Sequence, residues 1–429
     1  MKETQTIAQV VQEHLCIGCG ICKAVCPAQC IMVKREGGFY LPQIDEKKCL
    51  RCGLCLAHCP GRGCDYKETY ALTQAPVPSN LYEGTVLDSF TAVTRDEEIL
   101  RTSASGGVVT TLVRHLLESG KYDCAFLVET QTYEDAAHSV RKVAGDNLLD
   151  TAKSRYLPVV QTEAVAYLLG HKTERIIFVG VPCFVQSLVR LIAERNLDRN
   201  QYLIIGLFCE ATMNYNVVEY LAECANLPLD AMAKLHFKNK ELNGWPGNVC
   251  LFDKEGKRHD LPKSVRMGAK PYFSPERCLY CVDKCNQFAD VSVGDNYTKR
   301  HAERMGSSSV LVRTQRGMVA KDAELFQIWE EEPQRVFEAQ KVAEKVKNLC
   351  FQRMSGATTL IRNEEFSLPA DWERYRPAYQ MEMHALSLGA AHDFPAIREE
   401  LRKKAEEKRK RKSFWGKLKR LFGIVKETK

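Results

Sequence analysis

The feature that most constrains this chain is a cysteine pattern that occurs twice within residues 16–60. Each copy has the spacing C-x2-C-x2-C-x3-C and is followed by proline. Three thiolates two residues apart can wrap one loop around three corners of a 4Fe–4S cubane, and this is the spacing that binds two such clusters. The fourth corner needs a sulfur from elsewhere in the chain, and the proline helps to turn the backbone after the fourth cysteine.

The ligands of the two predicted clusters follow from this pattern. In two-cluster ferredoxins, the fourth cysteine of each run binds the cluster of the other run. We therefore assign one cluster to Cys16, Cys19, Cys22 and Cys59, and the other to Cys49, Cys52, Cys55 and Cys26. The alternative is a pair of structural zinc sites, but zinc needs two C-x2-C pairs per ion and leaves the remaining cysteines and prolines unexplained. We therefore predict a protein that transfers single electrons.

The length and the cysteine content limit the class of protein. A chain of 429 residues is too long for a ferredoxin alone, and its 45% hydrophobic content is ordinary for a globular protein. Its N-terminus lacks an apolar signal core, so we read the high count of 19 cysteines as a sign of metal binding in a cytoplasmic protein rather than of disulfides. We find no apolar run of about 18 residues, so we expect no membrane-spanning helix.

The charge is concentrated at the C-terminal end. Residues 398–429 carry 14 Lys and Arg against 5 Asp and Glu, a net charge of +9, which leaves −2 on the other 397 residues. A near-neutral body argues against nucleic-acid binding and moves the question of partners to the tail.

The pattern of apolar segments changes along the chain. Residues 1–75 form the predicted ferredoxin-like domain, with a hairpin near Gly37–Pro42 and a linker at residues 74–80. After residue 84, helical patterns at residues 107–118 and 185–195 alternate with strand patterns at residues 124–129, 175–180 and 202–208. This alternation predicts an α/β (α+β) chain, in which a core with a largely parallel sheet follows the ferredoxin domain.

A second set of cysteines lies in the predicted core. Cys183 and Cys209 each end a predicted strand, where ligands of α/β sheets commonly lie, and Cys278, Cys281 and Cys285 follow as a C-x2-C-x3-C run. Together they could supply a third 4Fe–4S cluster. The alternative is that a cysteine at a strand end is a small buried hydrophobic residue.

A loop of small residues precedes the predicted helix at residue 107. It reads Ser103-Ala104-Ser105-Gly106-Gly107. Such a loop leaves the free N–H groups of a helix N-terminus open to an anion. The alternative is an ordinary capped helix, and the loop alone does not decide between them.

Several motifs in fixed order resemble a known family. They are Ser105-Gly-Gly-Val-Val, Lys153-Ser-Arg-Tyr156, Gly-Val-Pro-Cys183, Gly-Leu-Phe-Cys209, Cys278 to Tyr297, and Gly306 to Thr314. Across roughly residues 10–320, the chain resembles the beta subunits of F420-reducing hydrogenase and F420H2 dehydrogenase. The resemblance implies a core at residues 76–340 that binds FAD and a 4Fe–4S cluster, followed by an extension at 341–397 and a basic tail at 398–429.

The resemblance also implies roles for individual residues. The core cluster would be bound by Cys183, Cys209, Cys278 and Cys281, which leaves Cys285 as an extra thiol. The FAD would lie at Ser103, Ser105, Gly106 and Gly107, with Lys153, Arg155 and Tyr156 nearby.

These cofactors imply an oxidoreductase, because a flavin accepts a hydride whereas each cubane carries one electron. We expect electron transfer between a hydride carrier, best represented by reduced coenzyme F420, and one-electron acceptors, in a complex with other subunits or a ferredoxin-type protein.

A G-x-G-x-x-G motif of an NAD site is absent. We assign no catalytic acid or base, and we give His236, His301 and Asp295 binding roles only. The alternatives are a ferredoxin-dependent reductase of an organic substrate and a non-catalytic wiring subunit.

The tail has the pattern of an interfacial helix. Its large apolar residues are Phe414, Trp415, Leu418, Leu421, Phe422 and Val425, which lie on one helical face, and a basic run at residues 408–412 precedes them. This pattern predicts binding to the anionic cytoplasmic face of a membrane, or docking into a groove of a partner subunit.

Overall fold

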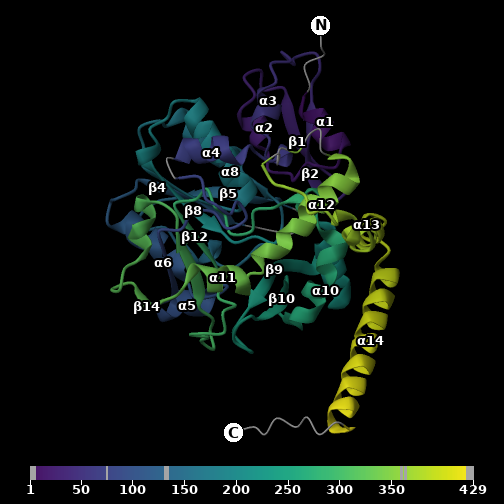
Figure 1. The fold of residues 1–429 in the computed structure, drawn as a ribbon. Helices are drawn as coiled ribbons and strands as arrows, with labels where there is room; N and C mark the ends of the chain where they lie inside the picture. Colours follow the sequence, from purple (N-terminus) through teal and green to yellow (C-terminus); the bar gives the residue numbers. More distant parts are fainter. Residues whose placement is uncertain (1–5, 74–75, 130–134, 358–360, 362–364, 422–429) are drawn as a thin grey trace.

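The computed structural model describes residues 6–73, 76–129, 135–357, 361 and 365–421, and side chains up to residue 411. Figure 1 shows the cysteine-rich N-terminal module at one end of a body built on a large sheet, with a long C-terminal helix that leaves the body.

The N-terminal module consists of short elements around the two cysteine runs. They are α1 (Ile7–Gln12), α2 (Ile21–Ala24), β1 (Ile31–Glu36), β2 (Phe39–Ile44), α3 (Leu54–Ala57), η1 (Pro60–Arg62) and α4 (Tyr66–Thr73). The predicted hairpin is confirmed, because β1 and β2 pair antiparallel and turn between Glu36 and Phe39. Gly20 and Gly53 take equivalent left-handed conformations, with φ of 68° and 76°, directly before α2 and α3. The two runs therefore share a local fold, in which glycine permits the turn after the second cysteine.

The body is built on a mixed sheet. Its strands, in spatial order, are β14 (Phe326–Glu330), β3 (Asp88–Thr94), β13 (Ser308–Val312), β12 (Val291–Asp295), β8 (Tyr202–Leu207), β7 (Ile176–Gly180), β4 (Cys124–Glu129), β5 (Ala137–Lys142) and β6 (Val159–Val160). The central run β12-β8-β7-β4 and the edge pair β5-β6 are parallel, whereas the other neighbours are antiparallel.

The expectation of a largely parallel sheet therefore holds for the central strands and fails at the sides. Strands β12 and β13 follow each other in the chain, as do β4 and β5, and each of these pairs is antiparallel. The predicted strands at residues 124–129, 175–180 and 202–208 are confirmed as β4, β7 and β8.

Helices cover the sheet. They are α5 (Glu97–Thr102), α6 (Val108–Glu118), α7 (Thr162–Gly170), α8 (Pro182–Glu194) and α9 (Asn216–Cys224). Helix α8 begins three residues before the predicted start, because Pro182 occupies its first turn, where a missing N–H costs nothing.

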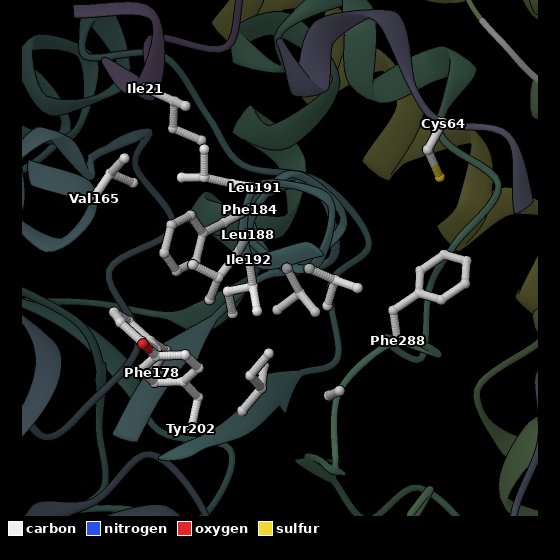
Figure 2. Packing of buried hydrophobic residues seen from close by; sticks show 14 of the residues in the cluster. Ile21, Cys64, Val165, Phe178, Phe184, Leu188, Leu191, Ile192, Tyr202 and Phe288 are labelled. Carbon is white, nitrogen blue, oxygen red and sulfur yellow. The ribbon is translucent and has the colours of Figure 1, made fainter. Parts of the chain in front are cut away.

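The packing of α8 joins the N-terminal module to the body. In Figure 2, Phe184, Leu188, Leu191 and Ile192 of α8 lie over Phe178 and Tyr202 of the sheet. Ile21 of α2 belongs to the same buried cluster and is 1% exposed. The module and the body therefore share one hydrophobic core.

A smaller antiparallel sheet lies beside the body. It consists of β11 (Arg258–Leu261), β10 (Asn248–Asp253) and β9 (Met232–Asn239), and α10 (Lys263–Phe273) follows it. Short 3-10 helices connect the larger elements, namely η2 (Leu149–Thr151), η3 (Arg199–Gln201), η4 (Leu229–Ala231), η5 (Glu276–Tyr280), η6 (Gln315–Ala320), η7 (Val342–Lys345) and η9 (Trp372–Tyr375).

The C-terminal segment is helical. It consists of α11 (Pro333–Ala339), α12 (Val346–Ser355), α13 (Arg376–Ala390) and α14 (Phe394–Leu421). The first turns of α14 pack on the body through the buried Ile397 and through Glu400, which accepts a hydrogen bond of 2.7 Å from Tyr272. The side chains of residues 408–411 are exposed, and the helix projects from the body there. The predicted apolar face of the tail lies outside the described side chains.

Candidate functional site

The first predicted group of thiols lies together in the N-terminal module. Burial raises the pKa of Cys16 to about 12, and the charge of Cys59 adds to this shift. The pKa values of Cys19 and Cys22 are also raised, first by burial and then by the charge of Cys59. The structure thus places Cys59, from the second run, beside the first three cysteines of the first run.

The second group surrounds a small cavity of about 20 Å³. Its cysteines are Cys26, Cys49, Cys52 and Cys55, as predicted, together with Cys30. The Sγ atom of Cys30 lies 3.5 Å from that of Cys26, and both sulfurs line the cavity. Sequence reasoning missed Cys30, although its C-x3-C spacing from Cys26 was a usable signal.

The two groups also share a backbone contact to sulfur. The amide of Gly18 donates to the Sγ atom of Cys16, and the amide of Arg51 donates to that of Cys49, each at 3.4 Å. Hydrogen bonds to the sulfurs are among the features that set the reduction potential of a cluster. Each donor lies two residues after the first cysteine of its run. The two runs are therefore alike in the contacts of their cysteines as well as in their spacing.

The third group forms where two neighbouring strands of the sheet end. Strands β7 and β8 run parallel, with Gly180 opposite Gly206, so Cys183 and Cys209 follow adjacent strand ends. Burial raises the pKa of Cys183 well above its usual value, and the charges of Cys209, Cys281 and Cys278 contribute. The structure thus brings these four expected ligands near one another.

Cys285 lies apart from this group. It packs in a separate cluster with Leu311 and Val336, and the strongest charge near its thiol is that of Arg313. Its C-x3-C spacing from Cys281 therefore does not bring it to the other four thiols. Cys285 is a small buried apolar residue of this cluster.

The donor sets fit iron–sulfur clusters better than single ions. Among the described residues, no group of three or more His, Cys, Asp or Glu side chains closes around one metal ion. Zn–S bonds of about 2.3 Å would draw four thiolates closely together. Buried thiols that influence each other without closing on one ion fit a larger cubane, whose binding would displace their protons.

The three groups lie in series. Cys22 of the first group is influenced by the charge of Cys55 of the second group. Cys183 of the third group is influenced by Cys19 of the first. The first group thus has a neighbour in each of the other two groups and is the middle member of the series. Cys19 lies at the side of the module that packs on α7.

The loop at residues 103–107 packs against the body on the side of β3 and β13. Ser105 donates a hydrogen bond of 2.7 Å to the carbonyl of Ser307, and the amide of Gly106 donates to Ser308 Oγ. A Cβ atom at Gly106 would lie 2.5 Å from the carbonyl oxygen of Ala92. Close packing against β3 and β13 thus explains the small residues, and only Ser103 Oγ stays buried without a described hydrogen-bond partner.

A pocket of about 550 Å³ lies near this loop. Lys153 and Arg155 line it as predicted, and sequence reasoning missed Arg101 and Lys234. The Nε atom of Arg155 is buried without a described partner, although its terminal nitrogens donate to Ala152 and Asp150. Lys153 has a φ of 76°, which is uncommon for a residue with a side chain. The lining therefore combines four cationic side chains with the carboxylates of Glu129, Asp150 and Glu241, and Arg155 keeps one buried donor without a described partner.

Tyr156 lies next to this pocket rather than in its lining. Its ring faces Phe237 at 5.7 Å, and the guanidinium of Arg266 lies 4.7 Å from its centre. Tyr156 therefore packs behind Phe237, which lines the pocket.

The three weaker candidates lie in different places. His236 lines the pocket, and burial together with Lys153 and Lys234 lowers its pKa to about 3, so its ring is neutral. Asp295 forms an ion pair with the buried Lys238, and His301 stacks on Trp329 with ring centres 4.8 Å apart. Only His236 is thus placed to contact a ligand in this pocket.

Among the described residues, no helix is long and apolar enough to cross a bilayer.

Comparison with known proteins agrees with these features. Residues 89–166 match the N-terminal family model of the coenzyme F420 hydrogenase/dehydrogenase beta subunit, and residues 173–333 match its C-terminal model. Residues 15–62 match a 4Fe-4S dicluster domain.

Individual relatives include proteins of Methanosarcina and Methanocaldococcus. A component of the F420H2 dehydrogenase of Methanosarcina mazei is 28% identical over 322 residues, which is 72% of this chain and 82% of the relative. Coenzyme F420-dependent sulfite reductase of Methanocaldococcus jannaschii is 28% identical over 234 residues, 51% of this chain and 34% of that protein. A solved chain of the F420-reducing [NiFe] hydrogenase complex from Methanosarcina barkeri is 18% identical, with a TM-score of 0.48, and the match covers 68% of this chain and 100% of that one.

The two consecutive beta-subunit matches span the large sheet and the cysteines of the third group, and the dicluster match spans the first two groups. The chain therefore belongs to the family of coenzyme F420 hydrogenase/dehydrogenase beta subunits and carries a 4Fe-4S dicluster domain in its N-terminal module.

Proposed function

We propose that this protein is an iron–sulfur flavoprotein that passes electrons between reduced coenzyme F420 and one-electron acceptors, as the electron-input subunit of a larger complex. The observation that carries the proposal is the series of three thiol groups that runs from the body to the exposed Cys52. The names of two relatives, a component of F420H2 dehydrogenase and an F420-dependent sulfite reductase, support the choice of carrier.

In this proposal, each thiol group holds one 4Fe–4S cluster. The ligands are Cys16, Cys19, Cys22 and Cys59 for the first group, Cys26, Cys49, Cys52 and Cys55 for the second, and Cys183, Cys209, Cys278 and Cys281 for the third. Bound FAD would exchange a hydride and the clusters would carry single electrons. Cys19 and Cys183, which are both half-buried, lie where the module meets the body.

The proposed site of FAD is the pocket that Lys153 and Arg155 line, whose lining carries four Lys and Arg side chains and three Asp and Glu side chains. Its volume of about 550 Å³ lies in the range of small-molecule sites, about 300–1,000 Å³. Lys153, Arg155 and Lys234 would bind the pyrophosphate, because lysine and arginine donate charge-assisted hydrogen bonds to phosphate oxygens. The unpaired Nε atom of Arg155 is a donor that such a ligand can satisfy.

The test is a cofactor count combined with a choice of donor. Protein purified without oxygen should hold about 12 iron atoms per chain, and acid should release FAD. Reduction by F420H2 should be faster than by NADH. Cys183→Ala should lose about four iron atoms and keep the N-terminal pair, whereas Cys285→Ala should keep all of them.

Three results would contradict parts of this proposal. Iron near eight atoms per chain removes the third cluster, and absence of FAD leaves a wiring subunit. Rapid oxidation of NADH with inert F420H2 rejects the deazaflavin carrier but keeps the flavoprotein.

A second candidate is a reductase that takes electrons from ferredoxin and delivers them to an organic substrate. The exposed Cys52 at the outer end of the series favours it, because a ferredoxin could dock there. Reduction of the flavin by reduced ferredoxin, but not by F420H2, would select this alternative.

The tail is proposed to hold the protein at an anionic membrane surface. The exposed basic run at residues 408–411 on the projecting part of α14 supports this role, because each basic residue near such a surface contributes about 1 kcal/mol. Docking to a partner subunit is the competing outcome.

A further inference from the structure

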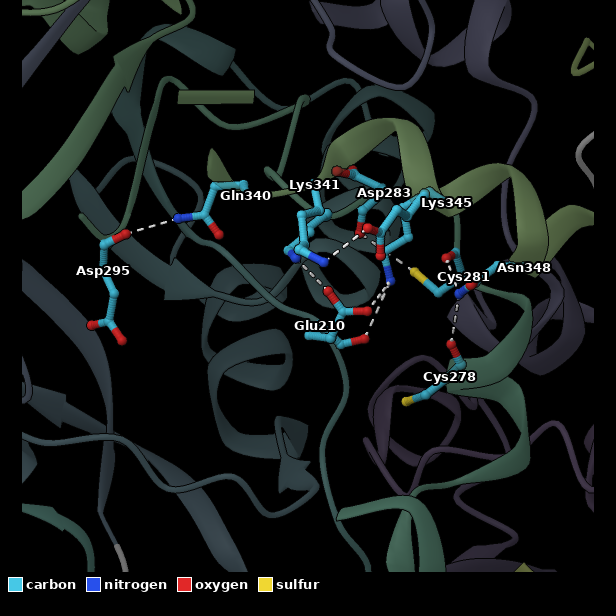
Figure 3. Close-up of polar contacts among 11 residues, drawn as sticks. Glu210, Cys278, Cys281, Asp283, Asp295, Gln340, Lys341, Lys345 and Asn348 are labelled. Atoms are coloured by element: carbon cyan, nitrogen blue, oxygen red, sulfur yellow. Dashed lines mark hydrogen bonds and ion pairs between the residues drawn. The ribbon is translucent and has the colours of Figure 1, made fainter. Parts of the chain in front are cut away.

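A segment beyond the family-matched residues folds back onto the third thiol group. The C-terminal family match ends at residue 333, whereas η7 and α12 cover residues 342–355. Figure 3 shows Lys345 and Asn348 of this segment beside Cys281 and Cys278. The extension thus reaches a site whose thiols all come from the matched part of the chain.

Lys345 is held by a carboxylate next to a cysteine of the group. Its side chain is 3% exposed, and its Nζ atom lies 3.1 Å from Glu210 Oε1. Glu210 directly follows Cys209, and its other oxygen lies 2.5 Å from Lys284 Nζ. Burial by itself would lower the pKa of Lys345, but Glu210 and then Cys281 and Cys209 raise it. The charged ammonium of Lys345 therefore pairs with Glu210, the residue after Cys209, and Figure 3 shows Cys281 beside it.

Asn348 holds the loop that carries Cys278 and Cys281. Its Nδ2 atom donates to the carbonyl of Cys281 at 2.8 Å and to that of Cys278 at 3.3 Å. The side chain is buried, so these hydrogen bonds are shielded from water. The extension therefore supplies both a charge and a geometric constraint.

The other charges around this group have mixed signs. Arg277 and Asp283 act on Cys281, and Lys270 acts on Cys209. Among these charged groups, Lys345 is the one that the extension contributes, and it lies near both Cys209 and Cys281. Loss of its charge should therefore change the electrostatic potential at two ligands, Cys209 and Cys281.

We propose that Lys345 is a positioning residue that raises the reduction potential of the cluster in the third group, while Glu210 lowers it and Asn348 fixes the ligand loop. This inference rests on the proposed function, in which Cys183, Cys209, Cys278 and Cys281 bind that cluster. One-electron reduction adds a negative charge to a buried site, with no bond made or broken. A buried ammonium nearby stabilises the reduced state, and a carboxylate destabilises it.

The experiment is a redox titration of anaerobic full-length protein, with dithionite as the reductant and the clusters followed by electron paramagnetic resonance. Lys345→Met should lower the midpoint potential of one cluster, so that its ratio of reduced to oxidised form at a fixed potential falls about tenfold, or about 59 mV for one electron. Lys345→Arg should restore the potential, and Glu210→Gln should shift it in the opposite direction.

Two further variants sharpen the result. Lys347→Met is the matched control, because the Lys347 side chain makes no hydrogen bond or ion pair with any described residue. It should leave every potential unchanged. Asn348→Leu should speed the loss of about four iron atoms to a chelator, because the ligand loop loses its two hydrogen bonds.

The outcomes separate this inference from the proposed function. About 12 iron atoms with an unchanged potential in Lys345→Met, or an equal shift in Lys347→Met, overturns the inference and leaves the third cluster in place. Iron near eight atoms per chain in the unaltered protein removes the third cluster and overturns both.

Discussion

At the scale of single residues, Cys30 gives the second group a fifth thiol. Its sulfur lies 3.5 Å from that of Cys26, so we expect it to replace Cys26 as a ligand when Cys26 is absent. Cys26→Ala should then keep more iron than Cys49→Ala, and Cys26→Ala with Cys30→Ala should lose a whole cluster, about four atoms. Iron analysis of the three anaerobic proteins measures this. Equal iron in Cys26→Ala and the double variant would leave Cys30 without a ligand role.

At the scale of elements, the loop before α6 is fixed by packing between two strands. Gly106→Ala would place Cβ 2.5 Å from a carbonyl oxygen of β3 and 2.8 Å from the amide of Ser308. Because backbone atoms cannot easily move, we expect this variant to lower the free energy of unfolding by about 1–3 kcal/mol. Gly170→Ala is the control, since nothing lies within 4 Å of its added Cβ. Thermal unfolding compares the two, and equal stability would mean that the loop is not packed as described.

At the scale of the whole molecule, α14 separates a docked part from a projecting part. Truncation after Lys404 keeps Ile397 and Glu400, which pack on the body, and removes the basic run. We expect full-length protein to sediment with anionic vesicles at low salt and the truncated protein to stay in solution. Neutral vesicles are the control. If both forms sediment equally, or neither does, the membrane proposal is wrong and docking to a partner subunit gains support.

The sequence predicted most of the features that depend on the spacing of residues close together in the chain. The C-x2-C-x2-C-x3-C runs predicted which cysteines lie together, and the strand ends predicted that Cys183 and Cys209 meet. The mixed directions of the outer strands were missed, because alternation of helices and strands does not report how neighbours pair. The contribution of Lys345 was also missed, since it depends on long-range folding of a segment with weak periodicity.

The small residues of the Ser103–Gly107 loop show a second limit of prediction from the sequence, because one composition fits two structures. A sequence of serines and glycines fits an open anion site and a tightly packed crossing equally well. The structure favours packing, because Gly106 lies against β3 and β13. Lys153 and Arg155, which came from the resemblance, line a pocket, whereas Arg101 and Lys234 carried no motif that could have marked them.

The shared hydrophobic core has a consequence for how the protein matures. Ile21 is buried in the same cluster as Phe178 and Leu188, and Cys19 and Cys183 lie near that contact. In the proposed cluster-bound protein, closure of the module on the body would leave these half-buried thiols less accessible to the carriers that deliver iron and sulfide. Loading must therefore precede closure or accompany it. Insertion of the clusters and docking of the module on the body would then have to occur in a set order during the maturation of this chain.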